Sequence, residues 1–305
     1  MTHIEDDGIK IYYDSYGEGV PLVFLHPFST DGGIWYPQTF PFAQTDHVIV
    51  IDHRGHGRSD RPATGYSIME HTDDVIAVLD ALKVDRAVFV GNSIGGIMAI
   101  ELNLDHPQRV IGKLILSSGT GLGEGMPPEA GAAFQNDYIG AFGGLLEGAI
   151  SARSKRERPE ILAVIRAHFS VPSNFPKHVL DAAMADPNGV FAWNIKDRLS
   201  SIQAPTLVVA GEEDLATTVA NNQLIVDNIP GAELRVIKDI GHFHEIQRPE
   251  VFNELVRGFV ARVVQEASLV SVPVMEEHEV GCGEAGASMR PWLAKPGRMP
   301  KAFRP

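Results

Sequence analysis

A single serine lies between two glycines in the segment Gly91–Gly95 (GNSIG), directly after the short apolar run Ala87–Val90. A sharp corner between a strand and a helix needs small residues around the serine, because the backbone there is strained and crowded. Such a corner lifts the hydroxyl of Ser93 above the edge of a sheet, at the N-terminus of the next helix. The pattern favours Ser93 as a nucleophile; the alternative is a glycine-rich turn whose serine has no role.

A serine hydroxyl attacks well only when a neighbouring base takes its proton. Among twelve histidines, His242 is the favoured base because it follows the predicted strand Glu233–Ile237, in the segment KDIGH. This loop lies at the carboxyl end of its strand, so we expect His242 at the same edge of the sheet as Ser93. The alternative is that His242 is a loop histidine without a role. Other histidines are expected to cap, form hydrogen bonds, face solvent or support the site: His53, His56, His106 and His244.

The base needs a carboxylate that fixes its tautomer and stabilises its cationic form. The segment Gly211–Asp214 (GEED) follows the predicted strand Thr206–Ala210, again at a carboxyl end. Asp214 is the favoured acid and Glu213 is its main rival. The alternative for Asp214 is a turn-forming or helix-capping aspartate. Along the chain the serine precedes the acid, and the acid precedes the histidine.

The elements that must position these side chains alternate along the chain. Short β-branched runs alternate with segments of helical period, which is typical of a mostly parallel α/β sheet flanked by helices on both faces. Gly8–Tyr16 suits an antiparallel hairpin at the sheet edge, because its apolar residues alternate with polar ones. Six further strands are expected, each covered on both faces: Leu22–Leu25, Val48–Ile51, Ala87–Val90, Lys113–Leu116, Thr206–Ala210 and Glu233–Ile237.

Three apolar stripes with a 3.6-residue period predict helices at Val75–Leu82, Ile97–Leu104 and Val251–Val263. Together, residues 1–120 and 202–267 are expected to form the α/β core.

Residues 121–201 interrupt this alternation and are expected to form an inserted helical cap. Helical patterns occur around Ala141–Ile150, Pro159–Phe169 and Pro176–Met184, and no strand pattern is clear. Residues 268–305 have five prolines and little periodicity, so they predict a loosely ordered C-terminal tail.

Composition excludes several classes of function. The net charge is −13, which argues against nucleic acid and against anionic membrane surfaces, since both attract basic proteins. The acidic N-terminus lacks a signal-peptide pattern, and no apolar run is long enough to span a membrane. With the lone cysteine Cys282, these features predict a cytoplasmic protein without an internal disulfide. An oligomer is compatible with the sequence, which does not determine the oligomeric state.

Taken together, the motifs resemble the α/β-hydrolase superfamily over residues 8–265. The matching pieces occur in the family's order: His26–Phe28 (HPF), Asp52–Ser59 (DHRGHGRS), the serine segment, Gly211–Asp214 and Gly241–Phe243 (GHF). The segments His26–Trp35 and Gly211–Thr217 are similar to those of the enol-lactonase and small carboxylesterase group, whose members carry a helical cap. By this resemblance the Asp52–Ser59 turn is structural, and Arg54 and Ser59 hold loops.

An acyl-transfer site also needs two backbone N–H groups for the charge that develops on the carbonyl oxygen. Ile94, the residue after the nucleophile, is expected to provide one. The resemblance assigns the other to Phe28; the alternative is a pocket or core aromatic. The family usually has glycine where this chain has Pro27, which has no N–H but is not the donor.

The resemblance implies a serine hydrolase that cleaves an ester or lactone of a small, largely apolar molecule through an acyl-enzyme. Trp35, Trp193 and Phe243 are candidate pocket residues, and core packing is the alternative for the two tryptophans. No metal or organic cofactor is expected. The alternatives are a hydrolase of C–C bonds in ring-fission products, whose usual tryptophan after the histidine is missing here, and a non-enzymatic ligand-binding receptor. Cofactor-free perhydrolysis is a third possibility.

Overall fold

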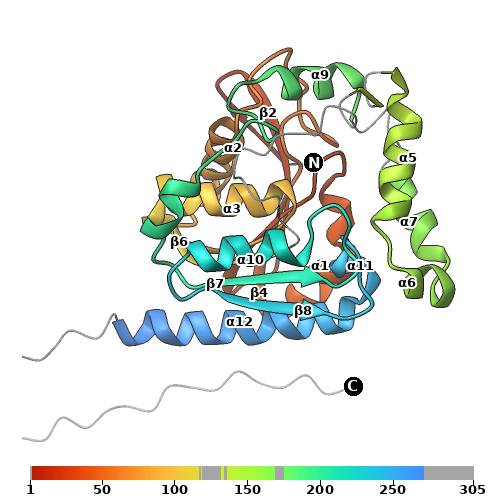
Figure 1. Ribbon diagram of the computed structural model, residues 1–305. Helices are drawn as coiled ribbons and strands as arrows, with labels where there is room; N and C mark the ends of the chain where they lie inside the picture. The colour runs from red at the N-terminus through yellow and green to blue at the C-terminus, as the bar shows by residue number, and fades with distance from the viewer. Residues whose placement is uncertain (1, 117, 119–131, 134–135, 169–174, 271–305) are drawn as a thin grey trace, which may run out of the picture.

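The computed structural model describes residues 2–116, 118, 132–133, 136–168 and 175–270. Within them, eight strands form one sheet in the order β1-β2-β4-β3-β5-β6-β7-β8 (Figure 1). Neighbours from β4 to β8 are parallel, whereas β2 is antiparallel to both β1 and β4. The strands are β1 (Thr2–Asp6), β2 (Ile9–Tyr16), β3 (Val20–Leu25), β4 (Asp46–Ile51), β5 (Ala87–Asn92), β6 (Val110–Leu116), β7 (Thr206–Gly211) and β8 (Glu233–Ile237).

The structure has an antiparallel edge hairpin, but the predicted segment Gly8–Tyr16 provides only its second strand, β2. The partner is β1, which the sequence pattern did not indicate. Asp7 and Gly8 connect the two strands and both have positive φ, 50° and 82°. Positive φ at both central residues is the geometry of the tight hairpin turn that matches strand twist, and Asp-Gly is a preferred sequence for it.

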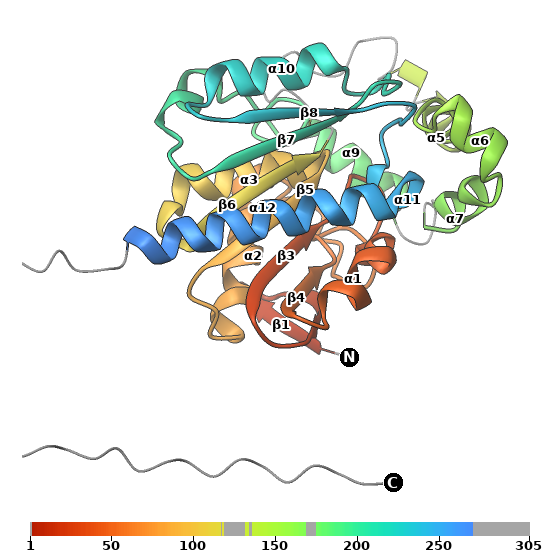
Figure 2. The same ribbon diagram turned by 90° about the horizontal axis from the view of Figure 1, so that it is seen from below.

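Helices cover both faces of the sheet, as Figures 1 and 2 show. On β3, Leu22 and Phe24 pack on one face, and Val23 and Leu25 on the other, because successive strand residues point to opposite sides. The first face is covered by α1 (Tyr36–Phe42) and α12 (Pro249–Val270); the second is covered by α2 (Ile68–Ala81), α3 (Ile94–Asp105) and α10 (Val219–Asn228). The α/β architecture with a mostly parallel sheet is therefore confirmed.

One strand departs from the prediction. β8 is the last strand of the sheet in the described part of the chain, and its residues are half-buried or exposed. Val236 in β8 is 45% exposed. The expectation that every core strand is covered on both faces is wrong here, because an edge strand has only one neighbour and its β-branched pattern does not reveal its place in the sheet.

Between β6 and β7 lie the helices α5 (Tyr138–Gly148), α6 (Ala152–Glu157), α7 (Glu160–His168) and α9 (Lys177–Ala185). Figure 1 shows α5, α6 and α7 apart from the sheet, on the side toward which the arrow of β7 points. The pattern had not indicated α6. Part of the expected 121–201 insertion, residues 121–131, 134–135 and 169–174, lies outside the described residues.

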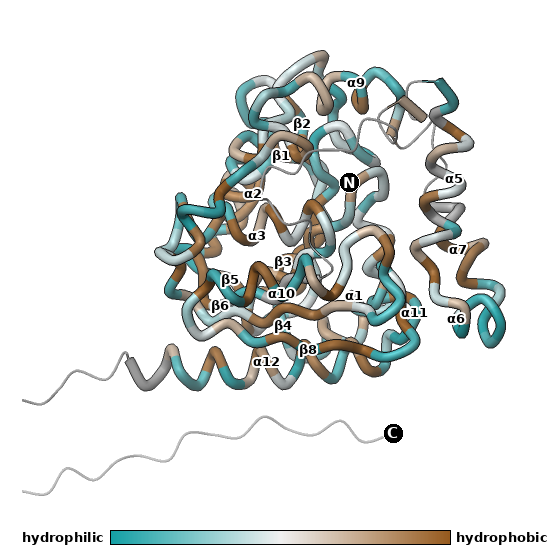
Figure 3. The backbone as a smooth tube through the Cα atoms, in the orientation of Figure 1, coloured by the Kyte–Doolittle hydropathy of each residue, from teal (hydrophilic) through white to brown (hydrophobic). Residues whose placement is uncertain are grey.

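Apolar and polar residues alternate along the last helix, α12 (Figure 3). Phe252, Val256, Phe259 and Val263 are buried against the sheet. The helix continues to Val270, past the expected end of the core at residue 267. Most of the predicted tail, residues 271–305, lies outside the described residues.

Candidate active site

The turn between β5 and α3 is a strained corner occupied by Ser93. Ser93 has φ 56° and ψ −115°, a conformation that costs energy for any residue with a Cβ. A Cβ at Gly91 would collide with the backbone of Gly95, and one at Gly95 would collide with the carbonyl oxygen of Leu25. Both glycines are therefore required for the corner. Ser93 itself is half-buried, so its hydroxyl is not sealed in the core.

The structure brings His242 and Asp214 together. The Nδ1 atom of His242 lies 2.9 Å from Oδ2 of Asp214, and both residues are largely buried. A carboxylate only accepts hydrogen bonds, so Nδ1 carries the proton and Nε2 keeps a lone pair. This tautomer is the one that a general base needs.

Burial by itself would lower the pKa of His242. The charge of Asp214 and its hydrogen bond outweigh that effect, so the pKa of His242 is raised above its ordinary value. The charge of Glu245 contributes in the same direction. The imidazole is thereby a stronger base than a free histidine.

Asp214 is held by the first turn that follows it. Its Oδ1 accepts from the backbone N–H groups of Ala216 and Thr217, at 2.8 and 3.0 Å. The hydroxyl of Thr217 donates to Oδ2 at 2.9 Å and lies 3.3 Å from Nδ1 of His242. The carboxylate that contacts the imidazole therefore has little freedom to rotate.

The rival carboxylate has a different role. Oε2 of Glu213 accepts from the backbone N–H of Ala152 at 2.8 Å, at the start of α6. The backbone N–H of His242 donates to the carbonyl of Ala149 at 2.7 Å. The junction between α5 and α6 is thus fastened to the loops that carry the acid and the histidine.

Asn92, the last residue of β5, contacts the His242 loop. The side-chain amide of Asn92 donates to the carbonyl oxygen of His242 at 3.2 Å and to both carboxylate oxygens of Glu245, at 3.1 and 3.2 Å. Burial raises the pKa of Glu245 to about 7. The sequence reasoning assigned no role to Asn92 or Glu245; a charged residue within the apolar context of Phe243 and Ile246 was the available signal.

The two expected N–H donors belong to the residue after Ser93 and to the loop that follows β3. Ile94 is the first residue of α3, so its N–H has no acceptor within the helix. Phe28 follows β3, whose end packs against Gly95. Its half-buried ring makes edge contacts with Phe175 and Phe191, at centroid distances of 4.5 and 5.4 Å.

The three predicted pocket residues are all buried. Trp35 is fully buried against Phe24 and Phe252. Trp193 is 8% exposed and donates from Nε1 to Glu101 at 2.7 Å. Both tryptophans contribute to core packing, which was the alternative for them, and the Trp193 bond holds α3. Substrate contact by either one stays a prediction.

Phe243 is 2% exposed, and its ring contacts the His242 ring edge-on, with centroids 5.3 Å apart. The buried Phe243 ring therefore packs against the imidazole and restricts its movement.

The remaining histidines divide by burial. His244 is fully buried, which excludes the surface position and leaves the supporting position that was also expected. Burial lowers its pKa to about 4. His53 and His56 are also buried, close to His26 and His71. His106 is half-buried after the end of α3.

The predicted structural roles in the Asp52–Ser59 turn are confirmed. Arg54 makes two hydrogen bonds with the buried carboxylate of Asp74, at 2.7 and 2.8 Å, and a third to the carbonyl of Gly65. The hydroxyl of Ser59 donates to the carbonyl of Asp52 at 2.5 Å. Both side chains hold loops in place.

In the described part of the chain, no group of three or more His, Cys, Asp and Glu side chains is arranged to hold a metal ion. Within the same residues, none of the helices has the length and apolar character that crossing a bilayer requires.

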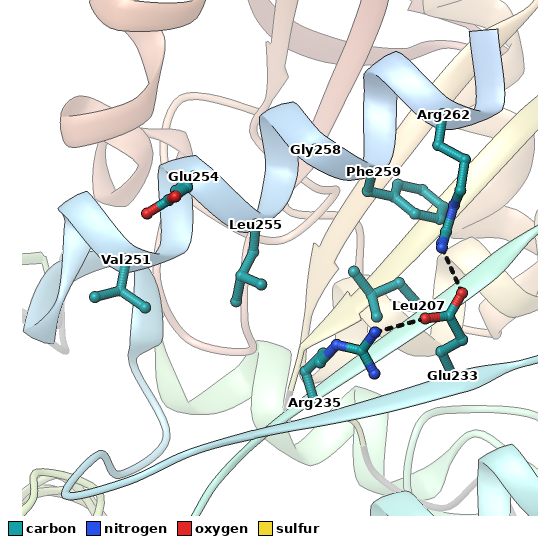
Figure 4. Close-up of a pocket in the computed structure, with 9 residues that line it drawn as sticks. All are labelled: Leu207, Glu233, Arg235, Val251, Glu254, Leu255, Gly258, Phe259 and Arg262. Atoms are coloured by element: carbon teal, nitrogen blue, oxygen red, sulfur yellow. Dashed lines mark hydrogen bonds and ion pairs between the residues drawn. The ribbon is translucent and has the colours of Figure 1, made fainter. Parts of the chain in front are cut away.

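A separate groove of about 380 Å³ lies between β7, β8 and α12 (Figure 4). Leu207, Leu255 and Phe259 contribute apolar surface, and Glu233 bridges Arg235 and Arg262. None of its described lining residues is a serine, histidine or cysteine, so it is distinct from the site around Ser93.

Comparison with known proteins agrees with this geometry. The model of the "Alpha/beta hydrolase family" matches residues 22–255. The chain belongs to the alpha/beta hydrolase family. A 2-hydroxymuconate semialdehyde hydrolase from Pseudomonas putida is 32% identical, over 83% of this chain and 92% of that protein. A 3-oxoadipate enol-lactonase from Acinetobacter baylyi is 27% identical, over 83% of this chain and 94% of its own length.

Solved structures give the same family and one much closer likeness. A structure described as an N-acyl homoserine lactone degrading enzyme is 87% identical, with a TM-score of 0.82, and covers 85% of this chain and all of that chain. The enol-lactonase from Burkholderia xenovorans is 26% identical, with a TM-score of 0.76, and covers 85% of this chain and all of its own. The solved structures that are similar to this hydrolase therefore include lactone-degrading enzymes.

Proposed function

We propose that this protein is a serine hydrolase that opens the lactone ring of N-acyl homoserine lactones. The observation that carries the acyl-transfer chemistry is the buried 2.9 Å hydrogen bond between His242 and Asp214. The bond from Asn92 to the carbonyl of His242 joins this loop to the strained corner at Ser93. The choice of substrate is supported by the 87% identity to a lactone-degrading enzyme over that enzyme's full chain.

In the proposed first step, Nε2 of His242 takes the proton of the Ser93 hydroxyl as Oγ attacks the lactone carbonyl carbon. The carbonyl oxygen becomes an oxyanion, and the amides of Phe28 and Ile94 donate to it. Collapse of this tetrahedral intermediate breaks the bond between the carbonyl carbon and the ring oxygen. The protonated His242 gives its proton to that oxygen, which leaves as a hydroxyl of the same molecule.

The second step releases the product. His242 deprotonates a water molecule, which attacks the acyl-enzyme, and the oxyanion forms again on the same carbonyl oxygen. When the ester bond to Ser93 breaks, the proton returns from His242 to Oγ. The net reaction adds one water to the lactone and yields an N-acyl homoserine. Asp214 stabilises the cationic imidazole in both steps.

The proposal is tested by following N-acyl homoserine lactones of short, medium and long acyl chains with the wild type, Ser93→Ala and the control Ser201→Ala. Ser201 is exposed and precedes the amino end of β7, far along the chain from the corner. Lactone opening releases acid, and the product closes again to the lactone when the solution is acidified. We expect turnover by the wild type and the control, and a loss of at least about a thousandfold in Ser93→Ala.

Two outcomes would contradict the proposal. Release of a free amine, without an acid-reversible product, would mean that the amide rather than the lactone is cleaved. Turnover of a ring-fission dienoate but of no lactone or p-nitrophenyl ester would favour the C–C hydrolase alternative, which the 32% identity to a semialdehyde hydrolase supports.

A further inference from the structure

The peptide that joins Pro27 to Phe28 is held firmly at its carbonyl oxygen. That oxygen accepts from the hydroxyl of Thr30 at 2.7 Å, from Nδ1 of His26 at 2.8 Å and from the backbone N–H of Thr30 at 3.3 Å. Thr30 and His26 are both fully buried. Three donors therefore converge on one carbonyl group that belongs to the loop after β3.

Holding this carbonyl sets the direction of the Phe28 amide. A trans peptide is planar, so its C=O and N–H point in opposite directions. The donors that pull the Pro27 carbonyl to one side therefore turn the Phe28 N–H to the other. Among the described residues, no hydrogen-bond acceptor lies against this N–H. The amide is left as an unused donor in the loop that packs beside the Ser93 corner.

His26 is itself fixed in the tautomer that this arrangement needs. Its Nε2 accepts from the backbone N–H of His53 at 3.0 Å, so its proton must be on Nδ1, which faces the Pro27 carbonyl. The His53 ring donates from Nε2 to the carbonyl of His26 at 3.0 Å and stacks on the His26 ring at 3.8 Å. Burial lowers the pKa of His26, which keeps it neutral.

We infer that Thr30, together with His26, is a positioning residue that aims the Phe28 N–H at the oxyanion. The inference rests on the proposed function and adds a residue to it. Pro27 has no backbone N–H, so in this part of the loop the Phe28 amide is the group that can donate a hydrogen bond to the oxyanion. Donors on a carbonyl also polarise the same peptide unit and strengthen its N–H as a donor. The hydrogen bonds that the structure gives the Thr30 hydroxyl are to the carbonyl of Pro27 and to Nδ1 of His26, both close to it in the chain.

The test replaces Thr30 by valine, which keeps the shape and removes the hydroxyl. Thr30→Ser restores the hydroxyl, and Thr72→Val is the matched control, because Thr72 is a buried threonine whose hydroxyl donates to the carbonyl of Met69 in α2. Steady-state kinetics on the best lactone are measured for each variant. Inhibition by a trifluoromethyl ketone is measured beside them, because its adduct with a serine carries an oxyanion.

We expect Thr30→Val to lower kcat by about tenfold to a hundredfold with little change in KM. The Phe28 N–H would no longer point at the oxyanion, and the oxyanion develops only in the transition state. The ketone should bind weaker by a similar factor. Thr30→Ser should recover most of both values, and Thr72→Val should keep the wild-type kcat even where its Tm falls.

An unchanged kcat in Thr30→Val, beside an inactive Ser93→Ala, would overturn the positioning role and leave the proposed function intact. A rise in KM alone would also overturn it, because that would indicate ground-state binding. Retained activity in Ser93→Ala would instead overturn the proposed function itself.

Discussion

The side chains of Asn92 and Glu245 are joined inside the protein although 153 residues separate them in the sequence. Nδ2 of Asn92 reaches both carboxylate oxygens, and the same nitrogen contacts the carbonyl of His242. This contact ties the end of β5, where Ser93 follows, to α11 (His244–Gln247). A buried carboxylate thus links the proposed nucleophile and the proposed base.

Glu245→Gln should change how stability depends on pH. The pKa of Glu245 is about 7 in the folded protein and 4.5 ordinarily. Between pH 4.5 and 7 the folded protein therefore keeps a proton that the unfolded chain has lost. Stability from this group is present below pH 4.5 and is lost as pH rises through 7. Glutamine should remove that loss and raise the unfolding free energy at pH 8 by about 1–3 kcal/mol relative to pH 5. Urea unfolding at both pH values measures it; an equal change at both would contradict the prediction.

The same substitution should shift the pH profile of catalysis. The charge of Glu245 helps to raise the pKa of His242, so its removal should move the acidic limb of kcat/KM to lower pH. Asp239→Asn is the control, because Asp239 is a partly exposed carboxylate of the same loop that pairs with Arg153. A shift of equal size in the control would show a general charge effect.

Asp214→Asn should lower kcat by about 10³–10⁴-fold, because an amide can donate to Nδ1 and favour the wrong tautomer of His242. Glu213→Gln should cost less than about tenfold, since its oxygen can still accept from Ala152. Kinetics on one substrate, with circular dichroism to verify folding, compare the two variants. A larger loss in Glu213→Gln would mean that Glu213 is the acid.

Lys113→Met should stabilise the protein most at neutral pH and below. Lys113 is fully buried, and desolvation lowers its pKa from 10.5 to about 7. Between these values the unfolded chain holds a proton that the folded state lacks, so wild-type stability rises with pH. The variant should gain about 2–4 kcal/mol at pH 6.5 and much less at pH 10. Thermal unfolding across this range is the measurement; exposed Lys196→Met should show no such trend.

Trp35→Ala should destabilise the protein by about 3–5 kcal/mol, the usual cost of removing a large core aromatic, and leave KM unchanged at temperatures where it is folded. Phe40→Ala, on the same helical region but 68% exposed, should cost little. Chemical unfolding and steady-state kinetics are compared. A raised KM with wild-type stability would restore Trp35 to the substrate pocket.

Local pattern was sufficient for every strand after β1, for the main helices and for the corner at Ser93. Period-2 and period-3.6 repeats report which side of an element is buried, and Gly91 and Gly95 report a backbone that excludes a Cβ. The sequence could not show that β8 is an edge strand, because a β-branched run looks the same with one neighbour or with two.

By itself the sequence determined the order of the elements and the residue types that acyl-transfer chemistry requires. The tertiary structure alone decided which carboxylate faces His242, that Trp35 belongs to the core, and that Glu245 and Lys113 are buried. The physical reason is that hydrogen bonding and desolvation depend on neighbours far away in the chain. Asp214 and Glu213 are adjacent and chemically alike, and only the packing of distant loops separates their roles.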